Sequence, residues 1–187
     1  MAEQGLYPLR QVEIRLKVSE GSPLYGSEPR DSPERAADVM AKMLAGMDRE
    51  YFCVVNLDTK LRPLSFNVVS IGGLDTCQVP VQNVFKAAIM TNAARTMLFH
   101  CHPSGDVRPS REDVETTKLL AEAGHLLGIP VVDHIIVAGG SGERYSMHEN
   151  MPELLRTDER GSVLGELKRQ KYRRNDRHGG LCEDPAL

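Results

Sequence analysis

A chain of 187 residues, of which 41% are apolar and 26% charged, is long enough for one domain with a hydrophobic core and short extensions. Its net charge of -3 gives no overall attraction to nucleic acid or to membranes, and no apolar run approaches the roughly 20 residues needed to cross a bilayer. The N-terminus lacks a signal-peptide pattern, and the four cysteines are scattered without a Cys-x-x-Cys pair. We therefore expect a cytoplasmic protein without a disulfide framework or a thiolate zinc knuckle.

The first half of the chain predicts two strands that flank a helix, and then a hairpin partner. Apolar residues alternate with polar ones from Val12 to Val18, as in a strand with one buried face. Ser32 and Pro33 then begin a helix whose apolar residues recur at helical spacing as far as Met47. The nearly continuous apolar run 51–57 predicts a strand covered on both faces, with 63–71 as its hairpin partner.

The second half predicts two more helices and three more strands. The expected helices are 81–89 and 110–127, the second closed by Gly128, and the expected strands are 96–100, 129–137 and a short one near Tyr145. Strands mixed with helices, several strands being apolar throughout, predict an α/β protein with helices on the faces of a sheet.

The composition divides the chain into three segments. We expect an N-terminal strand and loop extension over 1–31, one domain over 32–150, and a charged C-terminal tail over 151–187. The tail gathers lysines and arginines between Lys168 and Arg177. A solvated helix end and frayed tail is the simpler interpretation, and a weak electrostatic contact with nucleic acid is the alternative.

His100 and His102, followed by Ser110 and Asp113, form the most informative pattern in the chain. Two imidazoles two residues apart project from the same face of a strand, and a carboxylate a short loop later can close on that face. Two nitrogens and one oxygen suit zinc with a fourth position open to water, which is typical of a catalytic site. The parts also have ordinary interpretations, since Ser110-x-x-Asp113 can be a capping box. The whole pattern arises by chance in roughly one chain of this length in several thousand.

The same residues carry a resemblance to a known family. His100-x-His102-x7-Ser110-x-x-Asp113, with a glutamate upstream, resembles the JAMM or MPN-plus metallopeptidase motif. Between about 32 and 149 the chain is similar, more narrowly, to the RadC-like JAB domain family of bacteria. That likeness is carried by the segments His102-Pro103-Ser104-Gly105, Pro109-Ser110-Arg111-Glu112-Asp113 and Asp133-His134-Ile135-Ile136. The resemblance implies the JAB1/MPN domain fold, a cytidine-deaminase-like arrangement of α/β/α layers around a mixed sheet.

The resemblance also implies a role for each residue of the site. His100, His102 and Asp113 would bind Zn²⁺, and Glu50 would act as the general base. Ser110 would donate a hydrogen bond to the oxyanion. Together these roles describe a hydrolase that cleaves a peptide or isopeptide bond in a peptide or protein substrate. Asp48 and Asp58 also lie near strand ends, and Glu50 is preferred because it adjoins the core strand and matches the family's position.

Several features depart from the family pattern or leave alternatives open. Cys101 stands where relatives commonly carry Asn; it should point away from the metal, although ligation by its thiolate stays open. Asp133 and His134 are expected to be structural or to orient a ligand. No counterpart of the helix-hairpin-helix DNA-binding module of longer members is expected in the N-terminal segment.

Two other functions remain open at this point. The first is a metal-dependent nucleic-acid hydrolase, or an accessory protein of DNA repair or mobile elements, suggested by the family's repair-linked name and the basic tail. The second is a catalytically silent JAB-type scaffold that binds a partner. The intact ligand positions favour activity. A nucleobase deaminase is excluded because its His-x-Glu and Pro-Cys-x-x-Cys patterns are absent from the sequence.

Overall fold

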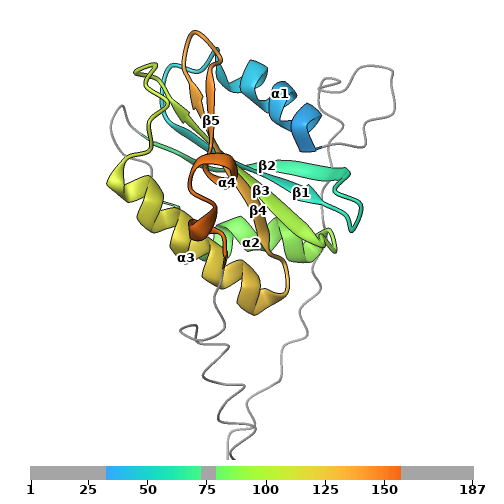
Figure 1. The fold of residues 1–187 in the computed structure, drawn as a ribbon. Coiled ribbons are helices and arrows are strands. Elements are labelled where there is room, and N and C mark those ends of the chain that lie inside the picture. Colours follow the sequence, from blue (N-terminus) through green and yellow to red (C-terminus); the bar gives the residue numbers. More distant parts are fainter. Residues whose placement is uncertain (1–32, 73–78, 157–187) are drawn as a thin grey trace, which may run out of the picture.

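The computed structural model of the chain describes residues 33–72 and 79–156. They form one five-stranded sheet with helices on both faces (Figure 1). The elements in chain order are α1 (Pro33–Leu44), β1 (Tyr51–Leu57), β2 (Pro63–Ile71), α2 (Val81–Met90), β3 (Arg95–His102), α3 (Arg111–Leu127), β4 (Val131–Ala138), β5 (Arg144–Ser146), α4 (Met147–Asn150) and the 3₁₀ turn η1 (Pro152–Leu154). The strand expected over 12–18 and most of the basic tail lie outside the described residues.

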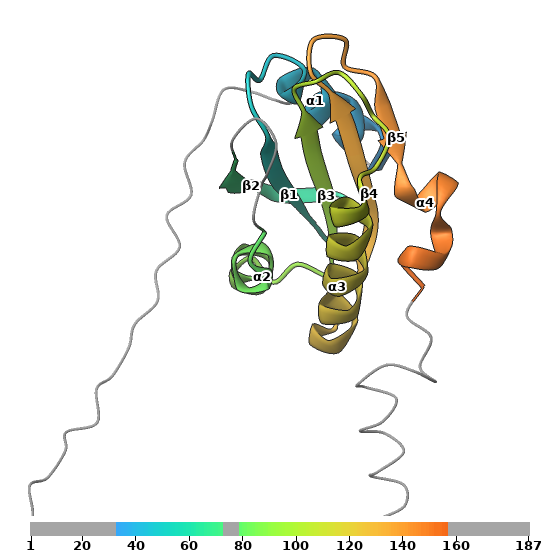
Figure 2. The ribbon, with the colours of Figure 1, turned by 90° about the vertical axis from the view of Figure 1, so that its left-hand side faces the viewer.

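The sheet is mixed, and its strand order is β2-β1-β3-β4-β5. β1 runs antiparallel to both of its neighbours, β3 and β4 are parallel, and β5 is antiparallel to β4. Helix α3 forms the crossover between the two parallel strands, which cannot be joined by a tight turn. Figure 2 shows α4 following β5 at the edge of the sheet opposite β2. This architecture confirms the predicted α/β class with a JAB/MPN-type fold.

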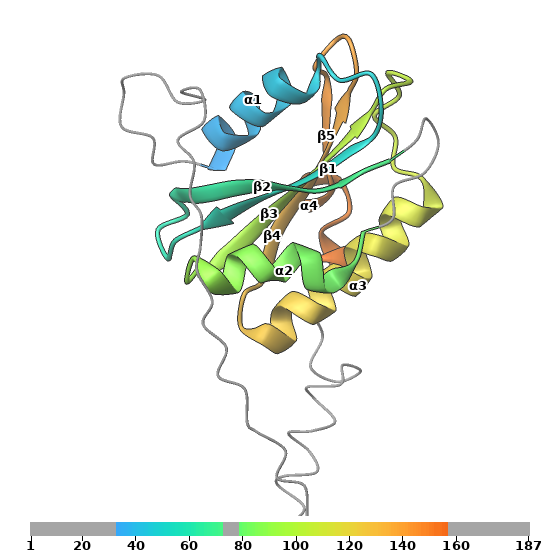
Figure 3. The same cartoon turned by 180° about the vertical axis from the view of Figure 1, so that it is seen from behind.

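The helices make three layers with the sheet, because α1 covers one face while α2 and α3 cover the other (Figures 1 and 3). Side chains of β3 alternate between these layers. Met97, Phe99 and Cys101 pack with α1, whereas Leu98 packs with α2 and α3. Every residue of β1 after Tyr51 is buried, as the apolar run predicted.

The apolar stripe of α1 is core packing, as its spacing predicted. From Ala36 to the end of this helix, the buried residues are Ala36, Ala37, Met40, Ala41 and Leu44. Met43 and Met47 are partly buried against the same cluster.

The structure confirms the helix expected over 81–89 as α2, and one of its apolar residues lies outside the buried face. Val84, Phe85 and Ala88 are buried, but Ile89 is 52% exposed. Each helical step turns by about 100°, so Ile89 falls beyond the edge of the face that the other three define.

The packed part of the chain also continues past Glu149, where the sequence pattern weakens. Leu154 is buried in a small cluster with Ile136 and Met147, next to the edge of the sheet. The boundary placed at residue 150 remains a prediction.

The ends of α3 follow from local sequence. Ser110 is the N-cap; its side chain accepts a hydrogen bond from the Asp113 amide, and the Asp113 side chain accepts one from the Ser110 amide. This capping box was the structural interpretation of the Ser-x-x-Asp pattern. At the other end, Gly128 has a φ of 73°, the left-handed conformation that favours glycine. The capping box fixes the direction of the Asp113 side chain.

Gly124 lets α3 pack closely against the Ile129 backbone and the Phe85 ring of α2, and a substitution there tests this packing. A Cβ at this position would lie 2.6 Å from the Ile129 carbonyl oxygen and 3.2 Å from the Phe85 ring. We expect Gly124→Ala to lower the free energy of unfolding by about 1–3 kcal/mol, because the backbone cannot yield as a flexible side chain would. Urea denaturation monitored by circular dichroism measures the change.

Gly46→Ala is the matched control, since a Cβ there meets nothing within 4 Å. Its free energy of unfolding should stay the same or rise slightly. Equal effects of the two substitutions would show that the α3 contact is not as tight as described.

Candidate metal centre

The two histidines of the motif lie at the C-terminal end of the central strand β3. His100 and His102 project from the same face of the sheet, and their ring centroids are 4.7 Å apart. His100 is only 7% exposed. The strand therefore places two neighbouring imidazoles in largely buried surroundings on the α3 side of the sheet.

Cys101, between them, faces the other way. It packs in the α1 cluster, and its Sγ donates to the carbonyl oxygen of Leu44 at 3.2 Å. Burial raises the pKa of the thiol to about 11, so that it stays protonated at neutral pH. The direction of its side chain, into the α1 layer, excludes Cys101 as a thiolate ligand of this centre, as the strand alternation predicted.

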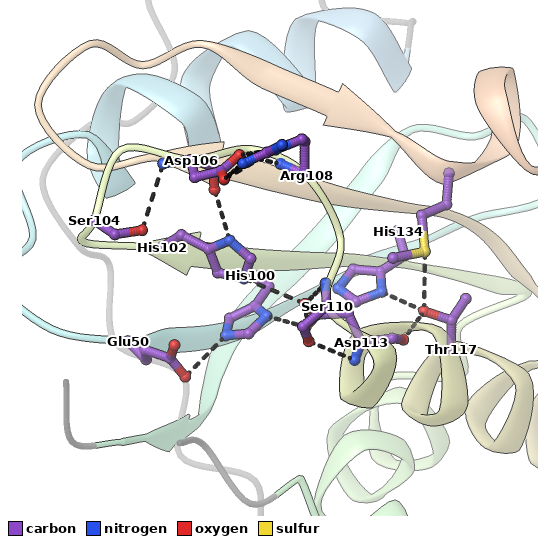
Figure 4. Close-up of polar contacts among 11 residues, drawn as sticks. Glu50, His100, His102, Ser104, Asp106, Arg108, Ser110, Asp113, Thr117 and His134 are labelled. Atoms are coloured by element: carbon purple, nitrogen blue, oxygen red, sulfur yellow. Dashed lines mark hydrogen bonds and ion pairs between the residues drawn. The ribbon is translucent and has the colours of Figure 1, made fainter. Parts of the chain in front are cut away.

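Glu50 reaches the same place from the neighbouring strand. It immediately precedes β1, and because Tyr51 pairs with Cys101, Glu50 lies beside the end of β3. Its carbonyl accepts a hydrogen bond from the Gly72 amide at 2.9 Å, which anchors the backbone. Its Oε2 lies 3.3 Å from Nε2 of His100 (Figure 4).

The two other acids considered from the sequence do not join this group. Asp48 is exposed and is paired with Arg49, its neighbour in the chain. Asp58 interacts with Arg62 in the turn after β1. Among these three acids, Glu50 is the one that the structure brings to the histidines.

Asp113 approaches from the first turn of α3 and contacts both rings. Its Oδ1 lies 2.7 Å from Nδ1 of His100, and its Oδ2 lies 3.3 Å from Nε2 of His102. Ser110 holds this carboxylate in place, since its hydroxyl donates to Oδ2 at 2.6 Å and its amide donates at 2.8 Å. Figure 4 shows Glu50 and Asp113 on opposite sides of the His100 ring. The structure thus gathers all five site residues expected from the sequence.

The grouping of metal donors differs in one respect from the expected set. In the described part of the chain, one group of three residues has ligand atoms that all lie within 4.8 Å of one another: Glu50, His100 and His102. The oxygens of Asp113 are instead engaged in direct contacts with the two imidazoles. Either carboxylate can complete a set of two nitrogens and one oxygen, a donor set that zinc accepts.

Electrostatics favour a cation at this place. Burial alone would lower the pKa of His100, but its hydrogen bonds with Asp113 and Glu50 outweigh burial and raise it to about 9. The contact with Asp113 also raises the pKa of His102. Burial acts to raise the pKa of Asp113, yet its contacts with both imidazoles hold it well below its usual range. Two carboxylates facing two imidazoles thus attract protons, and a divalent ion that binds there can displace these protons.

Other contacts orient the rings in ways that the sequence did not reveal. Nδ1 of His102 donates a hydrogen bond to the Asp106 carbonyl at 2.8 Å. In the neutral ring Nε2 then carries the lone pair that can bind a metal ion. The sequence analysis missed Thr117, which lies one helical turn after Asp113 and whose hydroxyl contacts the Asp113 carbonyl and His134. Its i+4 spacing from Asp113 could have indicated that it lies on the same side of α3.

Asp133 lies away from the centre. It accepts hydrogen bonds from the Ser146 hydroxyl and the His148 amide, and so connects β4 to β5 and α4.

The sequence profile of the RadC-like JAB domain matches residues 30–152. The chain belongs to this family. It is 46% identical over 144 residues to a UPF0758 protein of Caldanaerobacter subterraneus, an alignment that covers 74% of this chain and 62% of the relative. It is 36% identical to a UPF0758 protein of Syntrophomonas wolfei, with 73% and 61% of the two chains covered. A UPF0758 protein of Thermosynechococcus vestitus is 35% identical, with 81% and 62% covered.

The chain spans about three fifths of the length of these curated relatives. Their names carry a family number and no activity. In the described ranges 33–72 and 79–156, no helix combines the length and the apolar character needed to cross a membrane.

Two buried histidines predict how the stability of chelator-treated protein depends on pH. Burial lowers the pKa of His134 to about 3, below its value of about 6.5 in the unfolded chain, so stability is lost as the pH falls from 6.5 toward 3. The pKa of His100 is raised to about 9, so its contribution, of the order of 3 kcal/mol, is complete below pH 6.5 and is lost as the pH rises to about 9. We therefore expect the Tm to be highest near pH 6.5.

Calorimetry of the chelated protein between pH 4 and pH 9.5 measures this profile. The variant His100→Gln should lose most of the decline on the alkaline side, because the raised pKa of His102 leaves a smaller one, and should keep the decline on the acid side. A Tm of the unsubstituted chain that climbs steadily from pH 6.5 to 9 would contradict the described contacts of His100.

Proposed function

We propose that this chain is a zinc-dependent hydrolase of the JAMM type that cleaves a peptide or isopeptide bond. The convergence of two imidazoles and two carboxylates at the end of the sheet carries this proposal. Membership of the RadC-like JAB family supports it. The expected substrate is a peptide or a protein, and the cytoplasmic location expected from the sequence stays a prediction.

His100, His102 and Asp113 are the residues that would hold the zinc ion. Asp113 is favoured over Glu50 as the oxygen ligand because it contacts both histidines, whereas Glu50 contacts His100. When bound there, zinc would supply Lewis acidity and make hydroxide available from water near neutral pH. The hydrogen bonds from Ser110 to Asp113 keep that carboxylate directed at the rings.

Glu50 would act as the general base, which carries a proton from the attacking water to the leaving amine. Its carboxylate accepts a proton from the attacking water as the new C–O bond forms, and returns it to the amine as the C–N bond breaks. Its position supports this role, because it lies at the edge of the histidine pair, directly before a strand whose backbone is paired on both sides. An amide and a water then give a carboxylic acid and an amine, with no further reactant.

Ser110 would stabilise the negative charge that develops on the substrate carbonyl oxygen. Its hydroxyl has one proton, which is donated to Asp113 in the structure. In the reaction this proton would turn to the substrate oxygen, while the Ser110 oxygen continues to accept from the Asp113 amide. Helix capping and catalysis therefore use different parts of the same hydroxyl.

Glu50→Gln is the substitution that tests the assignment of base and ligand. We expect purified wild-type protein to contain about one zinc ion per chain, as measured by plasma mass spectrometry. Glu50→Gln should keep the zinc and lose hydrolysis of a peptide and an isopeptide panel by at least roughly 100-fold. Asp113→Asn should lose the zinc.

The same assay separates the other two functions. Loss of zinc from Glu50→Gln would make Glu50 a ligand and overturn its assignment as base. A zinc-loaded wild type that cleaves no peptide but cleaves DNA or RNA would support the nuclease. A zinc-loaded chain without any turnover would support the silent scaffold.

Ser110→Ala tests the oxyanion role against the capping role. We expect a loss of about 1 kcal/mol in the free energy of unfolding from the missing cap. In addition kcat should fall by roughly 100-fold because a donor to the substrate oxygen is missing.

Ser146→Ala is the matched control, since Ser146 caps α4 by accepting from the Glu149 amide. Within the described part of the chain its side chain bonds to Asp133 and Glu149 and to neither His100 nor His102. It should lose stability at unchanged kcat. A Ser110→Ala variant that keeps full kcat would limit Ser110 to capping.

A further inference from the structure

Behind the metal centre, a fully buried histidine lies among the residues that the reaction leaves unused. The His134 side chain on β4 has no exposed surface. Its ring centroid is 5.4 Å from Phe52 and 6.3 Å from His100, with the two imidazole planes 20° apart. His134 therefore lies directly against the ring of a proposed zinc ligand.

Thr117 connects this histidine to Asp113. The Thr117 hydroxyl oxygen lies 2.6 Å from the Asp113 carbonyl oxygen and 2.7 Å from Nδ1 of His134, and Sδ of Met147 is more distant at 3.1 Å. A carbonyl oxygen can only accept, so the single Thr117 proton is donated to Asp113. Nδ1 of His134 must then donate to Thr117. Figure 4 shows this run of contacts from His134 through Thr117 to the first turn of α3.

In the part of the chain that the structure describes, the second ring nitrogen of His134, Nε2, makes no comparable contact, so the bond with Thr117 is the polar interaction that this histidine contributes. Within the described residues, Nε2 of His134 is buried and has no hydrogen-bond partner. An unpaired buried nitrogen costs stability, and a phenyl ring would fill a similar volume without that cost. The donor at Nδ1 is therefore the group that distinguishes His134 from an apolar core residue.

The contact fixes α3 relative to the strand pair that carries the metal centre. His134 pairs in register with Leu98, two residues before His100. Thr117 lies one turn after Asp113, whose side chain faces both histidines. Loss of the bond between Thr117 and His134 would leave the first turn of α3 held to the sheet by one side-chain hydrogen bond fewer, next to the contacts of Asp113 with the two histidines.

We propose that Thr117 and His134 are positioning residues that hold Asp113 at the distance from His100 and His102 that zinc binding requires. This inference rests on the zinc site of the proposed function. It does not depend on which bond the centre hydrolyses.

The test compares substitutions that remove the hydrogen bond with substitutions that keep it. Thr117→Val keeps volume, and His134→Phe keeps a flat ring that is somewhat larger; each removes one partner of the bond. Thr117→Ser keeps the hydroxyl, and His134→Asn keeps an N–H donor at a similar position. Zinc affinity is measured by competition with a chromophoric chelator, on samples whose folding is verified by circular dichroism.

We expect Thr117→Val and His134→Phe each to weaken zinc binding by roughly 10- to 100-fold, the range found for groups that orient metal ligands. Thr117→Ser should restore affinity to within about threefold of the wild type, and His134→Asn should recover part of it. The double variant Thr117→Val, His134→Phe should bind no more weakly than either single variant, because both remove the same bond.

Thr96→Val is the matched control for the loss of a buried hydroxyl. Thr96 is fully buried on β3, and in the described ranges its Oγ1 has no hydrogen-bond partner. This variant should bind zinc like the wild type.

Unchanged zinc affinity in Thr117→Val and His134→Phe, with a lowered Tm, would overturn the inference and leave the pair a purely structural role. A wild type that binds no zinc would overturn it together with the zinc site. If affinities follow the expected order but the wild type cleaves neither peptide nor isopeptide, the hydrolase proposal fails and this inference stands.

Discussion

The contact between the Asp113 carboxylate and the His100 imidazole is the interaction on which the organisation of this molecule depends. It joins the first turn of α3 to the end of the central strand across 2.7 Å, in surroundings that exclude most water. Burying a charge is unfavourable unless it is paired and hydrogen-bonded. The capping box of Ser110 and the second histidine supply those partners, so the architecture of the helix start and the chemistry of the centre cannot be separated.

The sequence predicted those parts that depend on local patterns. The apolar run of β1, the Ser110 cap and the Gly128 end of α3 were found because periodicity and capping act over a few residues. The spacing of His100 and His102 likewise placed both rings on one face before any fold was known. The proximity of Glu50, fifty residues upstream, rested on family resemblance, since no local pattern reports which strands become neighbours.

Contacts across elements explain what the sequence could not predict. The bond between Thr117 and His134 joins α3 to β4, and nothing in either segment alone indicates it. The grouping of Glu50 rather than Asp113 with the two histidines depends on where the carboxylate oxygens lie within a few ångströms. The short helix after β5 was missed because four residues are too few to show helical periodicity; its Met147 packs in a small cluster with Leu154 of η1.

Cys101 separates two kinds of surroundings by a single step along the backbone. Its side chain belongs to an apolar layer under α1, while the residues before and after it belong to a polar centre on the opposite side. Genetic variation at this one position should therefore be limited by the volume of the space under α1, whereas variation at its two neighbours should be limited by chemical identity. One short strand thus places two different selective pressures on adjacent codons.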